Sequence, residues 1–468
     1  MSATALTMPK EKHSKIHAPP SKKISFPNNS ILKHSLFFLI LFIPLLIFIQ
    51  YKALQSALHF SWPPLASRLS DQDLTSMLRD SVTFLPLKDL RFSKQPESGH
   101  TWFMSSVNDT FEPNDPQYLY FPSNSSKGRV LCLSAHDRHD GAKNLYAFAW
   151  REALPQGATL LPGLTYVSST YYDHNNLWHG LNAIVPFIGW NMRKGCVVPA
   201  RWVLFHWGEL RSKMGKWVNS VAQVTIGNVE IETFEGIEGP ACFEEAVVFR
   251  HNHGGISKAR LREVYDRIRC KAREFCKVDT EKIRDNKDVQ MTLFLRTGAR
   301  SFKNESVVVR VFEEECRKAG NCRVKVEKTD NLSFCDQVGL MSETDILVTP
   351  HGAQMTNIMF MERNSSVMEF YPKGWEEFAG IGQYVYKWFS DWAGMKYQGV
   401  WRDPEGPPCA DPTDRSHCDF KDRQIGHDTA YFSKWASKVF EDMKEYKQSI
   451  AIKGTDSSAT RTSSCQCR

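Results

Sequence analysis

Residues 345–372 read DILVTPHGAQMTNIMFMERNSSVMEFYP, and this stretch decides the fold. Its first apolar run is typical of a buried strand, residues 354–361 of a short apolar helix, and residues 367–371 of a further strand. A strand, a helix and a second strand in this order predict a parallel sheet with a helical crossover. Ligands of such sheets bind beyond the carboxyl ends of the strands. The loop that begins at His351 is therefore the first candidate site.

The same alternation extends upstream, from residue 289 onward. Val289–Leu295 and residues 323–326 are predicted strands, and Glu305–Ala319 and residues 333–341 are predicted helices. Strands that alternate with helices predict a doubly wound, Rossmann-like α/β domain. Further upstream, residues 96–285 mix short apolar runs with turn signals and end in a predicted surface helix at 258–276.

Two loops at the predicted sheet edge carry groups that suit a diphosphate. Gly352 lets the backbone approach a ligand closely, and the helix that follows presents free N–H groups and the positive end of its dipole. The loop after Leu295 carries Arg296 and Arg300, whose guanidinium groups can bind phosphate oxygens in pairs. Each feature alone is more often a turn or a surface charge. We predict one site because both loops are expected at the same edge.

A membrane anchor is predicted near the N-terminus, where residues 36–49 form the apolar run LFFLILFIPLLIFI. With its polar flanks the segment reaches the length of about 20 residues that a bilayer core requires. A cleaved signal peptide is the alternative, but a long polar tail precedes the run and no small-x-small cleavage site follows it. Lysines dominate the tail, so the positive-inside rule keeps residues 1–34 in the cytosol and places the chain after residue 51 in the lumen.

Two further patterns agree with a lumenal body. Five Asn-x-Ser/Thr sequons follow the predicted anchor, at Asn108, Asn124, Asn304, Asn331 and Asn364. All 12 cysteines also follow it, as expected for an oxidising compartment. Proximity favours the pairs Cys316–Cys322 and Cys409–Cys418, while Cys465 and Cys467 lie in a polar tail and are expected to be free.

Charge and spacing exclude several classes of protein. The net charge of +7 suits an anionic partner, but it is too small to indicate a nucleic acid. No Cys or His cluster has zinc spacing, so no metal site is predicted. The Asp-x-Asp motif at Asp71–Asp73 lies in the predicted stem and follows no buried strand. A Golgi sulfotransferase would share the anchor, but the chain has no lysine-bearing phosphosulfate loop near the start of the lumenal region.

The stretch quoted first resembles glycosyltransferase family 61. That family carries a strand, then His-Gly-Ala-Gly-leucine-Thr-Asn, a helix, and a strand that ends in a glutamate and a proline. Here His351-Gly352-Ala353-Gln354-Met355-Thr356-Asn357 is followed by Glu369 and Pro372. The likeness continues upstream through residues 334–338 and 296–300. Gln354 replaces the usual glycine, which adds a side chain where a donor packs.

The resemblance implies a GT-B architecture, with two Rossmann-like domains facing a cleft behind a single transmembrane helix. It further implies inverting transfer of a pentose or N-acetylglucosamine from a UDP-sugar, with neither a metal nor another cofactor. The donor and diphosphate site is then expected to contain Arg296, Arg300, His351, Gly352, Ala353, Gln354, Thr356, Asn357 and Glu369. The acceptor is a glycan, a polysaccharide or a glycoprotein, and transfer of xylose or arabinose to a cell-wall-type polysaccharide is the first guess by family analogy.

On the acceptor side, Asn176, Trp178 and His179 resemble the family's asparagine–histidine motif. His179 is the candidate general base, although the acidic residue usual four positions later is replaced by Ala183. A buried core histidine is the other interpretation of His179. Trp207 and Glu209 are further cleft candidates, and a plain strand end is the alternative for them.

The expected domain order follows from these observations. It comprises a disordered cytosolic tail (1–34), a signal anchor (35–51), a stem that is helical around Asp71–Asp80 (52–95), an acceptor-side Rossmann-like domain (96–285), a donor-binding Rossmann-like domain (286–425), a C-terminal helix (426–449) and a disordered tail (450–468). The expected location is the Golgi membrane, and a Golgi enzyme complex or a homodimer is left open. A catalytically degenerate, lectin-like or scaffolding homologue is the alternative function, favoured by Gln354 and Ala183.

Overall fold

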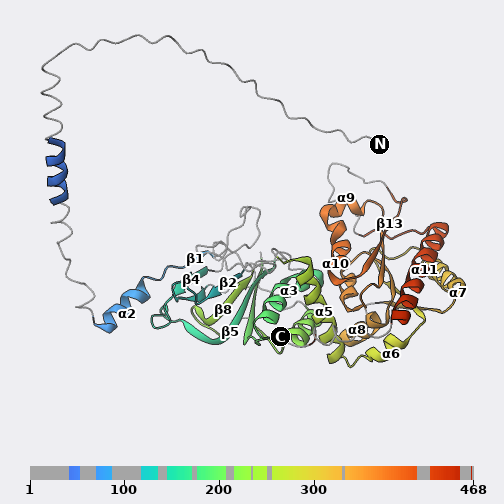
Figure 1. The fold of residues 1–468 in the computed structure, drawn as a ribbon, viewed down its shortest axis with the longest axis horizontal. Helices are drawn as coiled ribbons and strands as arrows, with labels where there is room; N and C mark the ends of the chain where they lie inside the picture. Colours follow the sequence, from blue (N-terminus) through green and yellow to red (C-terminus); the bar gives the residue numbers. More distant parts are fainter. Residues whose placement is uncertain are drawn as a thin grey trace, which may run out of the picture. The chain divides into compact units, whose positions relative to one another are not determined.

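The computed structural model describes residues 42–52, 70–86, 118–134, 145–170, 177–206, 215–232, 236–249, 256–328, 332–407, 422–453 and 465. The chain separates into two units, Met1–Gln72 and Asp73–Arg468, and the second holds both sheets (Figure 1). Residues 42–52 of the predicted anchor segment are helical, and residues 35–41 lie outside the described part. No helix among the described residues combines the length and the apolar character needed to cross a membrane.

The C-terminal sheet has five parallel strands in the order β10-β9-β11-β12-β13. They are β9 (Val289–Leu295), β10 (Cys322–Lys328), β11 (Ile346–Pro350), β12 (Ser366–Tyr371) and β13 (Lys396–Arg402). This order, with the first strand beside the third, is that of a doubly wound sheet. The predicted parallel sheet is therefore confirmed, and its switch point lies between β9 and β11.

Helices cover both faces of this sheet. Two apolar clusters lie on opposite faces: Leu347 of β11 packs into one of them, and its neighbour Val348 packs into the other. The helical elements of this half are α7 (Glu305–Ala319), α8 (Phe334–Glu343), η6 (Ala353–Phe360), α9 (Trp375–Ala379), η7 (Gly380–Tyr384), α10 (Val385–Ala393) and α11 (Thr429–Lys453). Helix α8 begins at Ser333, whose side chain forms a capping box with Asp336. The apolar helix predicted at 354–361 is a 3-10 helix, and each residue from Gln354 to Phe360 is buried.

The N-terminal sheet corrects the prediction of a second Rossmann-like domain over residues 96–285. Its strands are β1 (Leu85–Pro86), β2 (Tyr118–Phe121), β3 (Val130–Ser134), β4 (Leu145–Ala149), β5 (Thr159–Thr170), β6 (Arg201–His206), β7 (Glu230–Glu232) and β8 (Ala241–Phe249). Strands β7-β6-β5-β8 are parallel and follow a Rossmann order. Strands β1 to β4 pair antiparallel, and both β2 and β3 pair with β8, so the sheet is mixed. The Rossmann-like part is therefore limited to the four strands from β5 to β8.

The helices of the N-terminal half join it to the other half. They are α3 (Leu177–Arg193), α4 (Gly215–Ile226) and α5 (Lys258–Phe275), the last of which was predicted. A single apolar cluster contains buried side chains of these helices together with those of η6, α8 and α10. Trp217 of α4 also donates its Nε1–H to Oδ1 of Asn357 in η6, at 3.0 Å. The two sheets thus share one continuous core.

Disulfides reinforce both halves and the connection between them. Cys132–Cys242 joins β3 to β8, Cys276–Cys335 joins the end of α5 to α8, and Cys316–Cys322 joins α7 to β10 as predicted. Cys196 is also disulfide-bonded. The predicted pair Cys409–Cys418 lies outside the described residues.

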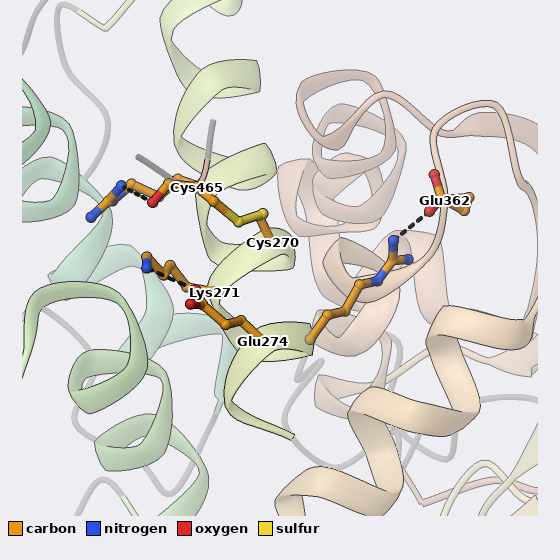
Figure 2. The surroundings of a disulfide bond; sticks show 7 residues. Cys270, Lys271, Glu274, Glu362 and Cys465 are labelled. Atoms are coloured by element: carbon orange, nitrogen blue, oxygen red, sulfur yellow. Dashed lines mark hydrogen bonds and ion pairs between the residues drawn. A yellow bond between two sulfur atoms is a disulfide. The ribbon is translucent and has the colours of Figure 1, made fainter. Parts of the chain in front are cut away.

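The prediction of a free Cys465 is wrong, because this residue is bonded to Cys270 of α5 (Figure 2). Arg267, one turn earlier on the same helix, donates to the carbonyl oxygen of Cys465 at 3.2 Å. Sequence spacing missed this pair because its members are 195 residues apart. Helix α2 (Asp71–Asp80) covers the residues that were predicted to be helical, and α11 (Thr429–Lys453) lies near the C-terminus.

Candidate functional site

The two predicted donor loops meet at the switch point of the C-terminal sheet. Strands β9 and β11 are parallel neighbours, so the loops that follow Leu295 and Pro350 leave the same edge. Arg296 of the first loop donates from Nη1 to the carbonyl oxygen of His351 in the second, at 3.2 Å. The backbone N–H of His351 bonds to Phe370 of β12, which holds the second loop against the sheet.

His351 is the centre of a buried polar chain. Its Nδ1 lies 2.5 Å from Oε1 of Glu369, a fully buried side chain on β12. The other oxygen of Glu369 accepts a hydrogen bond from the Tyr397 hydroxyl of β13, at 2.7 Å. Both carboxylate oxygens of Glu369 are thus engaged, and the contact with Nδ1 fixes the orientation of the imidazole ring. Nε2 is the ring nitrogen that the carboxylate does not hold.

Aromatic rings enclose the imidazole of His351. The ring centroids of Tyr371, Trp375 and Tyr386 lie 5.0, 4.7 and 5.2 Å from it. The Trp375 ring also contacts the guanidinium group of Arg300, at 4.8 Å from its centroid. The enclosure leaves His351 only 8% exposed, so the neighbouring groups determine its protonation state.

Burial sets the charge state of this cluster. It lowers the pKa of His351; Glu369 opposes the shift, while Arg300 and Arg296 add to it. Burial, followed by the repulsion from Arg296, lowers the pKa of Arg300 to about 10, so this side chain stays cationic at neutral pH. Burial and the nearby Glu369 raise the pKa of Tyr397. Two cations beside a neutral imidazole form an anion-binding constellation.

The backbone of Arg300 adopts an unusual conformation. It has φ of 60°, in the left-handed region, and its N–H donates to the carbonyl oxygen of Arg423 at 2.9 Å. A non-glycine residue in this region is uncommon and is frequent at functional sites. The turn presents the Arg300 guanidinium group beside Trp375, on the side of the sheet edge where His351 lies.

A side chain at Gly352 would displace the ends of two flexible side chains, and the backbone angles there do not call for glycine. The φ of Gly352 is extended, but a Cβ at this position would clash with Oε1 of Gln354 and Nη1 of Arg296. The Gln354 side chain folds back over the loop and donates from Nε2 to the carbonyl oxygen of Pro350, at 2.7 Å. Gln354 therefore packs between the glycine and the arginine, at the position where the sequence indicated an open diphosphate seat.

Asn357 and Thr356 lie inside the protein. Asn357 donates from Nδ2 to Gln337 of α8 at 2.9 Å and to the Gln354 carbonyl oxygen at 3.0 Å, and it accepts from Trp217. These contacts fix η6 to both halves of the molecule. Thr356 is fully buried on the same 3-10 helix, which begins at Ala353.

The acceptor-side candidates are only partly described. Trp178 of α3 packs against Tyr386, Phe389 and Trp392 of α10, with ring centroids 5.0–6.3 Å apart, and so contributes to the contact between the halves. His179 lies in α3 but its side chain is outside the described part, as are residues 176, 207 and 209 entirely. Two of the predicted sequons, at residues 108 and 331, lie outside the described part of the chain. Asn124 and Asn304 are described and are exposed.

Asn364 differs from the other described sequons. Its Nδ2 donates to the Tyr446 hydroxyl of α11 at 2.8 Å, and the Ser365 and Ser366 side chains that follow are buried.

Within the described residues, no group of three or more His, Cys, Asp or Glu side chains is placed to hold a metal ion. Asp71 and Asp73 lie on the stem helix α2.

Four residues of the cluster escaped the sequence analysis, among them Tyr371, which was predicted only as the end of a strand. Tyr397 lies on an edge strand without a clear apolar pattern, and Trp375 and Tyr386 lie on short helices after β12. The available signal was topological, because β13 is the parallel neighbour of β12 and places Tyr397 close to Glu369.

Residues 161–368 match the family model of Glycosyltransferase 61. This stretch belongs to glycosyltransferase family 61. The match runs from β5 to β12 and includes both loops of the cluster. It confirms the resemblance that the sequence indicated.

The other comparisons add little. No curated protein matches the chain. Among the solved structures that match is the metal-soaked Flv1 flavodiiron core from Synechocystis sp. PCC6803, with a TM-score of 0.24 and 10% identity, covering 45% of this chain and 44% of that chain. A likeness of that degree carries no argument about this protein.

Proposed function

We propose that the protein is a Golgi type II glycosyltransferase that moves a pentose or N-acetylglucosamine from a UDP-sugar to a glycan, polysaccharide or glycoprotein, with inversion. The observation that carries the proposal is the meeting of Arg296, Arg300 and His351 at the switch point of a parallel sheet, inside a stretch of glycosyltransferase family 61. Such switch points are where α/β sheets bind ligands.

The two arginines supply the electrostatic part of the mechanism. In a single displacement the acceptor hydroxyl attacks the anomeric carbon, the bond to the UDP oxygen breaks, and negative charge grows on the diphosphate. Arg296 and Arg300 stabilise that charge from the β9–α7 loop, and burial strengthens the effect of Arg300. The proposal gives this role to the arginines and not to a divalent metal, as the family resemblance implies.

The architecture proposed for the reaction is of the GT-B type. The Rossmann-ordered strands β5 to β8 then form the core of the acceptor-side domain, and the five-stranded sheet forms the donor domain. The acceptor side is assigned to Asn176, Trp178, Trp207 and Glu209, with His179 as the base that takes the acceptor proton. The packing of Trp178 against α10 supports a role at the boundary of the two halves.

The compartment is supported by covalent structure. Disulfides on both halves of the protein indicate a lumenal domain of the secretory pathway. Residence in the Golgi and anchoring through residues 35–51 are proposed on the charge and apolar patterns of the N-terminus.

One observation favours the alternative, a lectin-like or scaffolding homologue without activity. The Gln354 side chain packs over Gly352 beside Arg296 and narrows the approach to the loop backbone. If Gln354 does not move aside, a diphosphate cannot reach the backbone N–H groups of that loop.

A panel of UDP-sugars separates the two functions. The chain after residue 51 is secreted from eukaryotic cells, and its melting temperature is measured with UDP-xylose, UDP-arabinofuranose and UDP-N-acetylglucosamine. A ligand that binds the folded state raises the melting temperature, and the best donor is then assayed for UDP release with candidate acceptors. The transferase proposal fails if no nucleotide shifts the melting temperature and none is turned over.

A further inference from the structure

We propose that binding of a nucleotide-sugar diphosphate between Arg296 and Arg300 makes His351 take up one proton, so that an imidazolium joins the two guanidinium groups. The inference rests on the proposed function, because it takes this cluster as the donor site. It adds a third cation that exists only while the donor is bound, and it predicts a proton exchange that can be measured without any transfer reaction.

The hydrogen-bond geometry leaves one nitrogen of His351 to change state. Nδ1 lies 2.5 Å from Glu369, whose second oxygen is occupied by Tyr397. A neutral imidazole in this contact donates its Nδ1 proton to the carboxylate and keeps a lone pair on Nε2. Uptake of a proton therefore occurs at Nε2, and Glu369 remains in place to balance the new charge.

The charges around His351 come from four parts of the C-terminal half. Among the described residues, Glu369 of β12 is the carboxylate that acts on His351, and Arg296 and Arg300 of the β9–α7 loop are the cations; Asp422 in turn acts on Arg300. The ionisable or charged groups that face the imidazole are Glu369, Tyr371, Tyr386, Arg296 and Arg300, and Tyr397 bonds to the other oxygen of Glu369. The three tyrosines stay neutral near pH 7, because burial raises the pKa of each. The balance is thus one carboxylate against two guanidinium groups.

A bound diphosphate reverses this balance. Without it, burial disfavours the imidazolium and the two cations repel it, which together outweigh the attraction of Glu369. A diphosphate brings negative charge to the same two guanidinium groups and cancels their repulsion. The proton comes from solvent when the donor binds and returns to solvent when the nucleotide leaves, so no other reactant is needed.

The site is built so that this change stays local. His351 is fixed through its backbone to both loops, by the Arg296 bond to its carbonyl oxygen and by its own N–H bond to β12. Trp375 contacts both the imidazole and the Arg300 guanidinium group, so both groups pack against a common ring. The charge on His351 can therefore change without movement of the loop.

Isothermal titration calorimetry in several buffers tests the proposal. The probe is UDP-xylose or UDP-N-acetylglucosamine, whichever raises the melting temperature, with no acceptor present. A nucleotide sugar is chosen over UDP because its diphosphate has no group that titrates near neutral pH. At pH 7, the observed binding enthalpy is plotted against the ionisation enthalpy of the buffer, and the slope gives the number of protons taken up. We expect a positive slope between zero and one for the wild-type protein.

Two variants assign the proton to His351. His351→Gln keeps a polar side chain at the position and is expected to abolish the slope, while His427→Gln, the same change at a described histidine outside the cluster, is expected to retain it. Tyr397→Phe removes one hydrogen bond to Glu369, so the carboxylate attracts the imidazole proton more strongly and the pH of maximal uptake moves upward. If His351→Gln does not fold, the proposal is tested by the slope of the wild-type protein and by the pH of maximal proton uptake in Tyr397→Phe.

The possible failures are distinguishable. Binding of the nucleotide sugar with a slope of zero in the wild-type protein overturns the inference and leaves the proposed function intact. A slope that survives His351→Gln also overturns it, because another group then takes up the proton. If none of the UDP-sugars binds, both the proposed function and the inference are wrong.

Discussion

The parallel parts of the two sheets have related topologies, but they differ in the polar side chains that they bury. Strands β7-β6-β5-β8 of the N-terminal sheet and β10-β9-β11-β12-β13 of the C-terminal sheet are both of the open α/β kind. The central strand β5 of the first sheet buries the neutral Thr165, whose hydroxyl accepts a hydrogen bond from Arg201 at 3.1 Å. The second sheet buries Glu369 on a central strand and His351 just beyond the end of its neighbour.

The difference marks the switch point of the C-terminal sheet as a candidate site, whereas the loops that follow β5, β6 and β8 lie outside the described residues. Burying ionisable groups is unfavourable unless they are paired, and perturbed groups cluster at functional sites. The C-terminal sheet carries this cost at its switch point, where Arg300 and His351 both have lowered pKa values. The parallel topology alone therefore does not make a site; the buried charges do.

The largest expected effect concerns the covalent frame of the two sheets. Cys132–Cys242 closes a segment of 110 residues in the N-terminal sheet, whereas Cys316–Cys322 closes one of 6 residues in the C-terminal half. By loop-closure entropy, replacing both cysteines of the first pair by alanine should cost about 5 kcal/mol in the free energy of unfolding, and the same change in the second pair about 2 kcal/mol. Denaturant unfolding of both double variants measures the two losses. Equal losses would contradict the entropic account.

The charged edge itself is tested by Arg296→Ala. Removing one donor that stabilises charge in the transition state typically lowers turnover by about 10²–10³-fold. Arg323→Ala, on β10 of the same sheet, removes an arginine that is 71% exposed and is the matched control. UDP release by the two variants is compared with the wild type. Unchanged turnover in Arg296→Ala would remove this side chain from the mechanism.

The shared core between the sheets is tested at Asn357. Asn357→Ala leaves the Trp217 indole N–H without its acceptor and Gln337 without its donor, and a buried unsatisfied polar group costs about 1–3 kcal/mol. Asn304→Ala, at an exposed cap without a side-chain hydrogen bond, is the control once N-glycans have been removed from all samples. The melting temperature should fall clearly for the first variant only. A similar fall for both would show that Asn357 does not join the halves.

The smallest expected effect is on the pH dependence of stability. The folded protein holds the pKa of His351 below its ordinary value of 6.5. Between the lowered value and 6.5 the unfolded chain binds more protons, so the free energy of unfolding falls as the pH falls through this window. The loss amounts to about 1.4 kcal/mol for each unit by which the pKa is lowered.

The measurement compares urea unfolding of the wild type and His351→Gln at pH 7.5, 6.5 and 5.5. The wild type should lose stability relative to the variant on acidification, while His427→Gln should follow the wild type. Parallel curves for the wild type and His351→Gln would show that the histidine pKa is not lowered in the free protein.

The sequence predicted the C-terminal sheet far better than the N-terminal one. Buried parallel strands are continuous apolar runs, and Ile346–Pro350 is buried at all five positions, so its pattern is unambiguous. The rule that parallel strands end at one edge then brought Arg296 and His351 together, as the structure confirms. Strands β2 to β4 are four or five residues long, which is too short for a period to distinguish parallel from antiparallel pairing.

The rest of the cluster depends on tertiary contacts that no local pattern carries. Tyr397 lies on β13, which has mostly half-buried positions, and Trp217 lies 140 residues from the asparagine to which it donates. The Gln354 side chain was expected near the donor, but its fold over Gly352 follows from the 3-10 geometry of η6, which apolar spacing does not distinguish from an α-helix.

The bond between Cys270 and Cys465 makes the C-terminal half a covalently closed loop. It ties a residue near the end of the chain to α5 (Figure 2), and every strand of the five-stranded sheet lies between the two cysteines in the sequence. A protease that cuts the backbone once inside this loop leaves both fragments attached to each other. The nicked protein would keep its full size on a non-reducing gel and separate into two bands only after reduction.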